Sequence, residues 1–79
     1  MTREKPILSR ELALVRVMTD RQEEALRVVG AWSGRLMELK DGYFTVEVCA
    51  TPDRISGLLE VLSDHGHVTA VRSGALSLG

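Results

Sequence analysis

The sequence predicts an α+β domain in which two helices cover one face of a four-stranded antiparallel sheet. The first observation is a β-hairpin in the middle of the chain. The apolar and β-branched runs 36–39 and 43–49 flank Asp41-Gly42, a dipeptide that supplies the positive-φ positions of a tight turn. The second is that a strand and a helix precede this hairpin, and a helix and a strand follow it. The order is therefore β-α-β-β-α-β.

Length and composition indicate a single globular domain. The chain has 79 residues, of which 44% are hydrophobic and 27% charged. A net charge of −1, with both signs interspersed, provides no basic field for a nucleic-acid backbone. No apolar run reaches membrane-spanning length, and the single cysteine suits a reducing compartment. We expect a cytoplasmic protein that binds neither nucleic acid nor membrane.

The first strand and helix of the domain follow a polar segment. Residues 1–10 contain Pro6 and lack periodicity, so we expect an N-terminal arm or linker before a single domain over 11–79. The nearly continuous apolar run 12–18 predicts a strand buried on two faces at the sheet centre. Thr19 and Gln22 have the spacing of a capping box at the start of a helix.

An apolar stripe follows this cap. Its members recur at helical spacing, and they are Ala25, Val28, Val29 and Trp32. Trp32 is expected in the core, as large aromatic side chains usually are. Gly34 can take the left-handed conformation that ends a helix.

The second helix and the last strand repeat this pattern. Thr51 is expected to cap the helix, with Pro52 in its first turn and Gly66 after its end. Its apolar stripe consists of Ile55, Leu58, Leu59 and Leu62. Residues 67–78 predict the final strand, with a bulge or bend at Ser73-Gly74. Two β-α-β units joined by the hairpin give an antiparallel sheet of order 4-1-3-2, which is the ferredoxin-like sandwich.

The two faces of this sheet differ in composition. Because side chains alternate along a strand, the helices should cover one smooth apolar set: Ala13, Val15, Val17, Phe44, Val46 and Val48. The opposite face would carry Leu12, Leu14, Arg16, Met18, Tyr43, Thr45, Glu47 and Cys49. That set is too apolar for water, and a second copy of the chain could cover it. The alternative is a wet, mixed-polarity face on a monomer.

We therefore expect a homodimer that uses this face or the edge strand near residues 72–78. Arg16 and Glu47 could form a cross-strand ion pair within the contact. The predicted interface residues are Leu12, Leu14, Arg16, Tyr43, Glu47, Cys49, Arg72, Ser73, Gly74 and Leu76.

A metal site is not expected. Cys49, Asp64, His65 and His67 include suitable ligand types. However, the two histidines flank the helix stop at Gly66, and no Cys-x-x-Cys or third histidine completes a shell. Cys49 has no activating neighbour indicated by spacing, so it is expected to be a small buried residue.

Nucleic-acid and enzyme functions on the same topology also fit poorly. RNA-recognition motifs stack bases on aromatic residues of the third strand. Gly42-Tyr43 matches the start of that pattern, but Thr45 and Val48 occupy the further aromatic positions, and Glu47 adds a negative charge. An acylphosphatase-like enzyme would require an asparagine, and the sequence contains none. No nucleophile elbow, glycine-rich phosphate loop or paired-carboxylate motif is present. We expect no catalytic residues and no cofactor.

Several short segments in order resemble the C-terminal domain of the acetolactate synthase small subunit. They are Arg10-Glu11-Leu12 with Leu14-Val15-Arg16-Val17, Gly34-Arg35, Phe44-Thr45-Val46-Glu47-Val48, and Arg72-Ser73-Gly74 followed by Leu78. The resemblance covers residues 11–79 and implies two things. The fold would be ferredoxin-like and ACT-like, and the role would be that of a non-catalytic regulator of the thiamine-diphosphate enzyme of branched-chain amino acid biosynthesis.

The resemblance also implies a partner, the catalytic subunit of that enzyme. The family senses valine in an N-terminal ACT domain, and residues 1–10 are too short to form one. No effector residue is therefore carried over to this chain. The alternative function is a stand-alone ACT-like module that binds an amino acid or small metabolite at a dimer interface.

Overall fold

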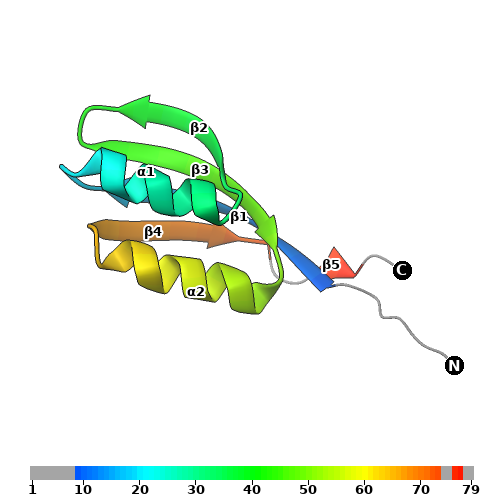
Figure 1. Cartoon of the computed structure of the whole chain (residues 1–79). Coiled ribbons are helices and arrows are strands. Elements are labelled where there is room, and N and C mark those ends of the chain that lie inside the picture. The colour runs from blue at the N-terminus through cyan, green and yellow to red at the C-terminus, as the bar shows by residue number, and fades with distance from the viewer. Residues whose placement is uncertain (1–8, 74–75, 78–79) are drawn as a thin grey trace, which may run out of the picture.

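The computed structural model describes residues 9–73 and 76–77 of the chain. Its elements follow the predicted order, with one further short strand (Figure 1). They are β1 (Ser9–Met18), α1 (Gln22–Ala31), β2 (Arg35–Lys40), β3 (Tyr43–Ala50), α2 (Pro52–Ser63), β4 (His67–Arg72) and β5 (Leu76–Ser77). β1 takes in Ser9 and Arg10, which the sequence suggested were part of an arm.

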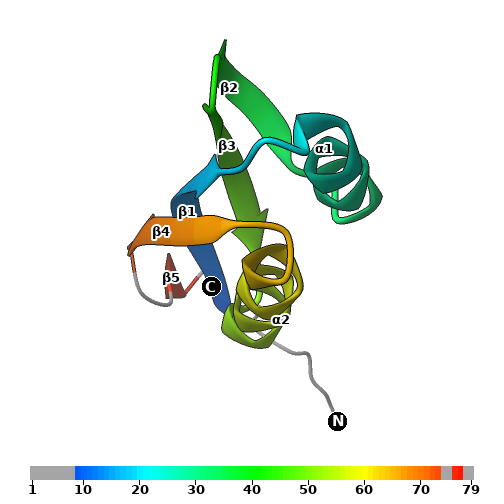
Figure 2. The ribbon, with the colours of Figure 1, turned by 90° about the vertical axis from the view of Figure 1, so that its left-hand side faces the viewer.

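The strands lie in the order β2-β3-β1-β4, and each of these pairings is antiparallel. This is the predicted order 4-1-3-2 read from the other edge. β5 lies off this path and pairs with the start of β1. Figure 2 shows α1 and α2 on the same side of the sheet. The predicted ferredoxin-like sandwich is therefore confirmed.

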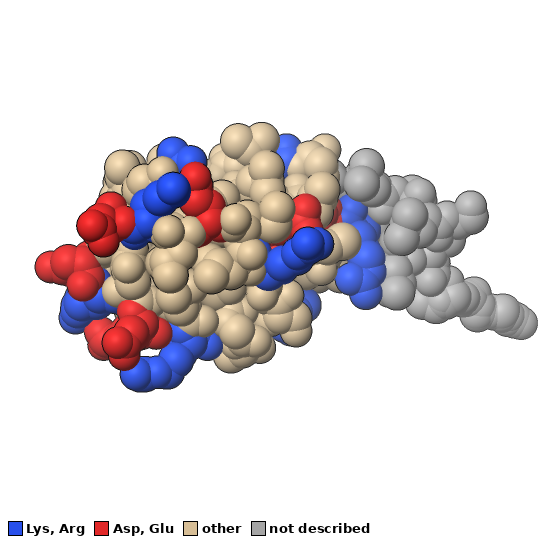
Figure 3. All heavy atoms as spheres, turned by 90° about the horizontal axis from the view of Figure 1, so that it is seen from above, with Lys and Arg blue, Asp and Glu red and all other residues tan. Residues whose placement is uncertain are grey.

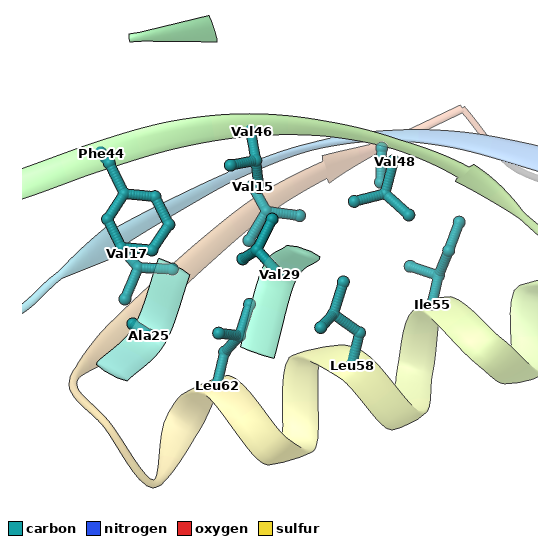
Figure 4. Close-up of a cluster of buried hydrophobic side chains, with 11 residues drawn as sticks. Val15, Val17, Ala25, Val29, Phe44, Val46, Val48, Ile55, Leu58 and Leu62 are labelled. Carbon is teal, nitrogen blue, oxygen red and sulfur yellow. The ribbon is translucent and has the colours of Figure 1, made fainter. Parts of the chain in front are cut away.

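The core lies between the helices and the sheet (Figure 4). The six strand residues predicted for the covered face are all buried. Ala25 and Val29 of α1 and Ile55, Leu58 and Leu62 of α2 complete the core. Trp32 is only partly buried, although its ring packs against the core cluster. Periodicity alone thus identified the residues that hold the sandwich together.

The start of α1 differs from the prediction. α1 begins at Gln22 without a side-chain cap hydrogen bond. The Thr19 hydroxyl instead donates to the carbonyl oxygen of His65 at 2.7 Å. The Gln22 amide donates to the carbonyl oxygens of Lys40 at 2.6 Å and Tyr43 at 3.2 Å. The Thr19 hydroxyl accepts the Arg21 N–H at 3.0 Å, whereas a capping box would have it accept the Gln22 N–H. The predicted capping box is therefore wrong, and the two side chains instead join the corner after β1 to the turn before β4 and to the hairpin.

The second helix starts where predicted, although its cap is weaker. Thr51 is the N-cap residue of α2 and Pro52 opens the helix, but the Thr51 side chain makes no cap hydrogen bond. The hydroxyl of a threonine N-cap usually accepts a bond from an N–H of the first turn. The Thr51 hydroxyl is therefore not used in capping.

Positive backbone φ angles occur at Gly42, as expected, but not at Asp41 or Gly34. Ser33 has a φ of 63°, so it takes the left-handed conformation that was predicted for Gly34. Gly34 is required for space instead, since a Cβ there would overlap the Val29 side chain. In the hairpin turn Gly42 has a φ of 89°, whereas Asp41 is not at positive φ. Only one of the two turn residues is therefore left-handed.

The last strand is divided. β4 ends at Arg72, and Ser73 is bonded to Leu12 in both directions: the Leu12 N–H donates to the Ser73 hydroxyl and the Ser73 N–H donates to the Leu12 carbonyl, each at 2.9 Å. Gly74 lies outside the described residues. A register shift between Leu36 and Glu38 places an irregularity in β2, where the sequence did not predict one.

Candidate interaction surface

No described helix covers the second side of the sheet, which we call the open face (Figure 2). β1 is central, yet its alternate side chains on this side are exposed: Leu12, Leu14, Arg16 and Met18. The expectation that β1 is buried on two faces is therefore wrong for the single chain. Tyr43, Thr45 and Glu47 of β3 are half-buried on the same side, as the register with β1 requires.

The half of the open face formed by β1 and β4 is largely apolar, although it also carries Arg16 and Thr69. Leu14 is 45% exposed, and Val71, its partner in register on β4, is 73% exposed. Beside them lies an open depression of about 340 Å³, lined by Leu14, Arg16, Thr45, Thr69, Ala70 and Val71. Large apolar side chains at such exposure in the middle of a sheet are typical of a surface that another molecule covers.

The half formed by β2 and β3 is polar, and its carboxylates pair with Arg35 of β2 or with Arg16 of the neighbouring β1. The Arg16 guanidinium lies 4.5 Å from the centroid of the Tyr43 ring, and it also lies 3.5 Å from the Glu38 carboxylate. Glu47 pairs instead with Arg35 at 4.0 Å. The predicted ion pair between Arg16 and Glu47 is therefore wrong. Arg16 and Glu47 each pair with a residue of β2, the strand next to β3 on the side away from β1.

Arg72 has an intramolecular role that its place in the predicted interface did not suggest. It donates to the carboxylate of Glu11, to the Ser56 hydroxyl at 3.1 Å and to the Pro52 carbonyl at 3.1 Å. Glu11 is buried, in phase with Ala13 and Val15 on the helix side of β1. Alternation places it there, but a carboxylate is rarely buried without a partner, and its partner comes from β4. Arg72 thus joins β4 to β1 and to the first turn of α2.

The other predicted interface residues are placed as follows. Cys49 is exposed at the end of β3, so the expectation of a buried thiol is wrong for the single chain. Ser73 is bonded to β1 as described above. Leu76 lies in β5, which pairs with the start of β1. Gly74 lies outside the described residues.

A second apolar group was missed by the sequence analysis. On the edge strand β2, Leu36, Met37 and Leu39 are each about half exposed. Leu36 and Leu39 pair in register with the buried Val46 and Phe44, so they lie on the helix side of the sheet, at its margin. The register of the hairpin could have placed Leu36 and Leu39 on the side of the sheet that the helices cover. Their exposure could not be inferred, because it depends on how much of β2 is covered by α1.

The ligand types considered for a metal do not gather. His67 is exposed on β4 opposite Met18, while His65 lies in the turn before it. The part of the chain that the structure describes contains no group of three His, Cys, Asp or Glu side chains suited to a metal ion. Within residues 9–73 and 76–77, neither helix has the length and apolar character needed to cross a bilayer.

Comparison with known proteins decides the family. The sequence profile described as the small subunit of acetolactate synthase matches residues 10–79. The chain belongs to this family. The match covers nearly the whole chain, and it confirms the resemblance to the C-terminal domain of the small subunit.

Relatives within the acetolactate synthase small-subunit family agree with this assignment. The small subunit of Aquifex aeolicus is 29% identical over 76 residues, which are 92% of this chain and 40% of that protein. That of Mycolicibacterium smegmatis is 29% identical over 73 residues, 90% of this chain and 43% of that protein. The chain therefore spans less than half the length of these relatives.

A solved member of the family has the same fold. The crystal structure of the acetolactate synthase small subunit from Thermotoga maritima matches with a TM-score of 0.80 at 18% identity. The match covers 90% of this chain and 45% of that one. The β-α-β-β-α-β sandwich described above is thus a fold that this family uses.

Proposed function

We propose that this domain is a non-catalytic regulatory module that acts by contact with the catalytic subunit of acetolactate synthase, in branched-chain amino acid biosynthesis. The observation that carries the proposal is the family match over residues 10–79. The curated relatives are named small subunits of acetolactate synthase. The chain matches only 40% to 43% of the length of these relatives. The proposal therefore concerns the part of their regulatory role that this domain carries.

The open face supports a role based on association. Leu12, Leu14 and Met18 are 39%, 45% and 50% exposed on the central strand, where a folded domain usually keeps such side chains covered. A domain of this size buries only about 60% of its unfolded surface, so it has little stability to spare for exposed apolar area. Contact with another protein would remove these side chains from water.

We also propose that a second copy of the chain covers the open face. In a two-fold dimer the open face of one copy would contact the open face of the other. Such an interface uses the same surface on both copies, so no further copy can add to it. Arg16 and Glu38, and Arg35 and Glu47, are already paired within one chain. The contact would therefore bury few unpaired charges, which are the costly kind.

The regulatory proposal is tested by mixing the purified chain with the catalytic subunit of acetolactate synthase encoded by the same genome. We expect the two proteins to elute together in size-exclusion chromatography. Light scattering should give the molar mass of a complex with a fixed number of copies of each. The chain alone should form no acetolactate. Separate elution at concentrations of tens of micromolar, or product formed by the chain alone, would contradict the proposal.

A second candidate is an ACT-like module that binds a free amino acid. The observation in its favour is the depression on the open face, where apolar Leu14 and Val71 lie beside the Arg16 guanidinium. A bound amino acid would place its carboxylate on that guanidinium. However, Arg16 already contacts Tyr43, Thr45 and Glu38, so its donors are largely used within the chain.

A further inference from the structure

The arginines of this chain fall into two groups. Among the described residues, the first group pairs with carboxylates and consists of Arg16, Arg21, Arg27, Arg35 and Arg72. Arg10 and Arg54 have no carboxylate partner within the described residues. These two unpaired arginines line the same cavity, of about 220 Å³, together with Trp32, Ser33, Cys49, Ala50 and Thr51.

Arg54 is held in a geometry suited to binding an anion. Its guanidinium carbon lies 5.0 Å from the centroid of the Trp32 ring. The ring itself packs against α2 at Gly57, where an added Cβ would come within 3.2 Å of the indole. Because an arginine stacked on an aromatic face keeps its N–H donors in its own plane, Arg54 retains the forked edge that carboxylates prefer.

Arg10 approaches the same cavity from β1. Its Nη1 donates to the backbone carbonyl of Cys49 at 3.4 Å, a contact that uses one donor of the guanidinium. The remaining donors have no partner within the described part of the chain. Two positive charges with no counter-charge among the described residues therefore line one cavity of a chain whose net charge is −1. Figure 3 shows acidic and basic side chains next to one another at several places on the face that it displays.

The volume of the cavity limits the size of the anion that it can receive. Pockets for metabolites and cofactors usually measure about 300–1,000 Å³ and enclose most of their ligand. A cavity of about 220 Å³ is below that range. It has room for a group the size of one side chain, and tryptophan and arginine are among the residue types most enriched at the positions that dominate protein–protein binding.

We propose that this cavity receives an aspartate or glutamate side chain of the catalytic subunit, with Arg54 as its principal ligand and Arg10 as the second. This inference rests on the proposed function and names the surface that serves it. The open face remains available for the second copy of the chain. Salt should weaken the contact, since two charged pairs at a surface are screened.

The test measures binding of the chain to immobilised catalytic subunit by interferometry. Arg54→Met keeps an apolar side chain over Trp32 but removes the charge, and Arg10→Met does the same at β1. Arg27→Met is the matched control, because Arg27 is an exposed arginine whose only ion pair is the weak one with Glu23. Circular dichroism melts check that each variant is folded.

We expect Arg54→Met to raise the Kd about 30-fold, as truncation of a dominant interface arginine does, and Arg10→Met to raise it less. Arg54→Lys should restore part of the affinity, because it returns the charge without the fork. Arg27→Met should bind like the wild type. Trp32 is the only tryptophan of this chain, so the fluorescence of the free chain reports whether a small anion added to it enters the cavity.

The outcomes separate this inference from the proposed function. A wild-type chain that does not bind the catalytic subunit would overturn both. If the wild-type chain binds, and Arg54→Met and Arg10→Met bind as tightly as the control Arg27→Met, that result would overturn the inference alone. So would a saturable shift of Trp32 fluorescence by inorganic phosphate at low millimolar concentration, which would indicate a small-anion site. A change in the sedimentation of the free chain caused by Arg54→Met would identify a second copy as the occupant and would overturn it too.

Discussion

Arg72 and Glu11 form a charge pair at the edge of the core, with Arg72 Nε 2.5 Å from Glu11 Oε1. The Glu11 side chain is only 6% exposed, whereas that of Arg72 is 31% exposed. Arg72 also bonds to Ser56 and Pro52 of α2, so one guanidinium joins β1, β4 and the start of a helix. Removing either partner would leave a buried or half-buried charge without compensation.

Arg72→Met should therefore destabilise the domain by about 3 kcal/mol, because it leaves the Glu11 carboxylate buried and unpaired. The free energy of unfolding in urea measures the effect. The double variant Glu11→Gln with Arg72→Met should be more stable than Arg72→Met alone, since the buried charge is gone. As a control, Arg27→Met removes an exposed helical pair with Glu23 and should change stability by no more than about 0.5 kcal/mol. Equal effects of Arg72→Met and Arg27→Met would show that the pair near the core is energetically unimportant.

Gly66→Ala should be strongly destabilising. A Cβ at Gly66 would overlap the backbone carbonyl of Met18 and come within 2.8 Å of the Thr19 Cβ. Because a backbone atom cannot turn aside as a flexible side chain can, we expect a loss of about 3 kcal/mol, the upper end of typical overpacking costs. Gly30→Ala is the control, since nothing lies within 4 Å of a Cβ there. In the helix α1 that change should stabilise by about 0.5–1 kcal/mol. Thermal melts of the two variants should shift in opposite directions, and a shift in the same direction would refute the packing argument.

Free branched-chain amino acids should not bind the chain. Arg16, the cation beside the open-face depression, is engaged by Glu38, Thr45 and Tyr43, so no guanidinium is free there to take a carboxylate. Calorimetric titration with valine, leucine and isoleucine should give no heat beyond dilution. Saturable heat with any of them, abolished by Arg16→Gln, would favour the ACT-like module over the regulatory contact.

Sequence reasoning was most successful where burial alone decides the structure. The alternation of Ala13, Val15 and Val17 and the helical stripe through Ile55 and Leu58 correspond directly to the core. Period and turn residues therefore predicted the sheet order and the covered face. Both follow from the requirement that each element bury its apolar side.

Sequence reasoning failed where a polar side chain had a choice of partners. Thr19 and Gln22 have the spacing of a helix cap, yet both bond to distant carbonyl groups. Arg16 bonds to Glu38 rather than to Glu47 because β2 supplies a carboxylate at closer range. Such choices depend on three-dimensional distances that local spacing does not contain. The cavity at Trp32 was missed for the same reason, since its residues come from four separate stretches of the chain.

The open face makes a prediction about association. We expect a homodimer in sedimentation experiments at several concentrations, and we expect Leu14→Asp to dissociate it, because an unpaired carboxylate is costly in a closed apolar interface. Leu76→Asp tests the edge near β5 in the same way. A monomer at high micromolar concentration, or a dimer unaffected by both Leu14→Asp and Leu76→Asp, would refute this interface.

The most direct test of the central claim is the rate of acetolactate formation by the catalytic subunit as the chain is added. We predict a change in kcat or KM that saturates at a fixed molar ratio of chain to catalytic subunit. Arg54→Met should require a higher concentration to reach the same plateau, while Arg27→Met should follow the wild type. A rate that stays constant up to a large molar excess of folded chain would contradict a regulatory role for this domain.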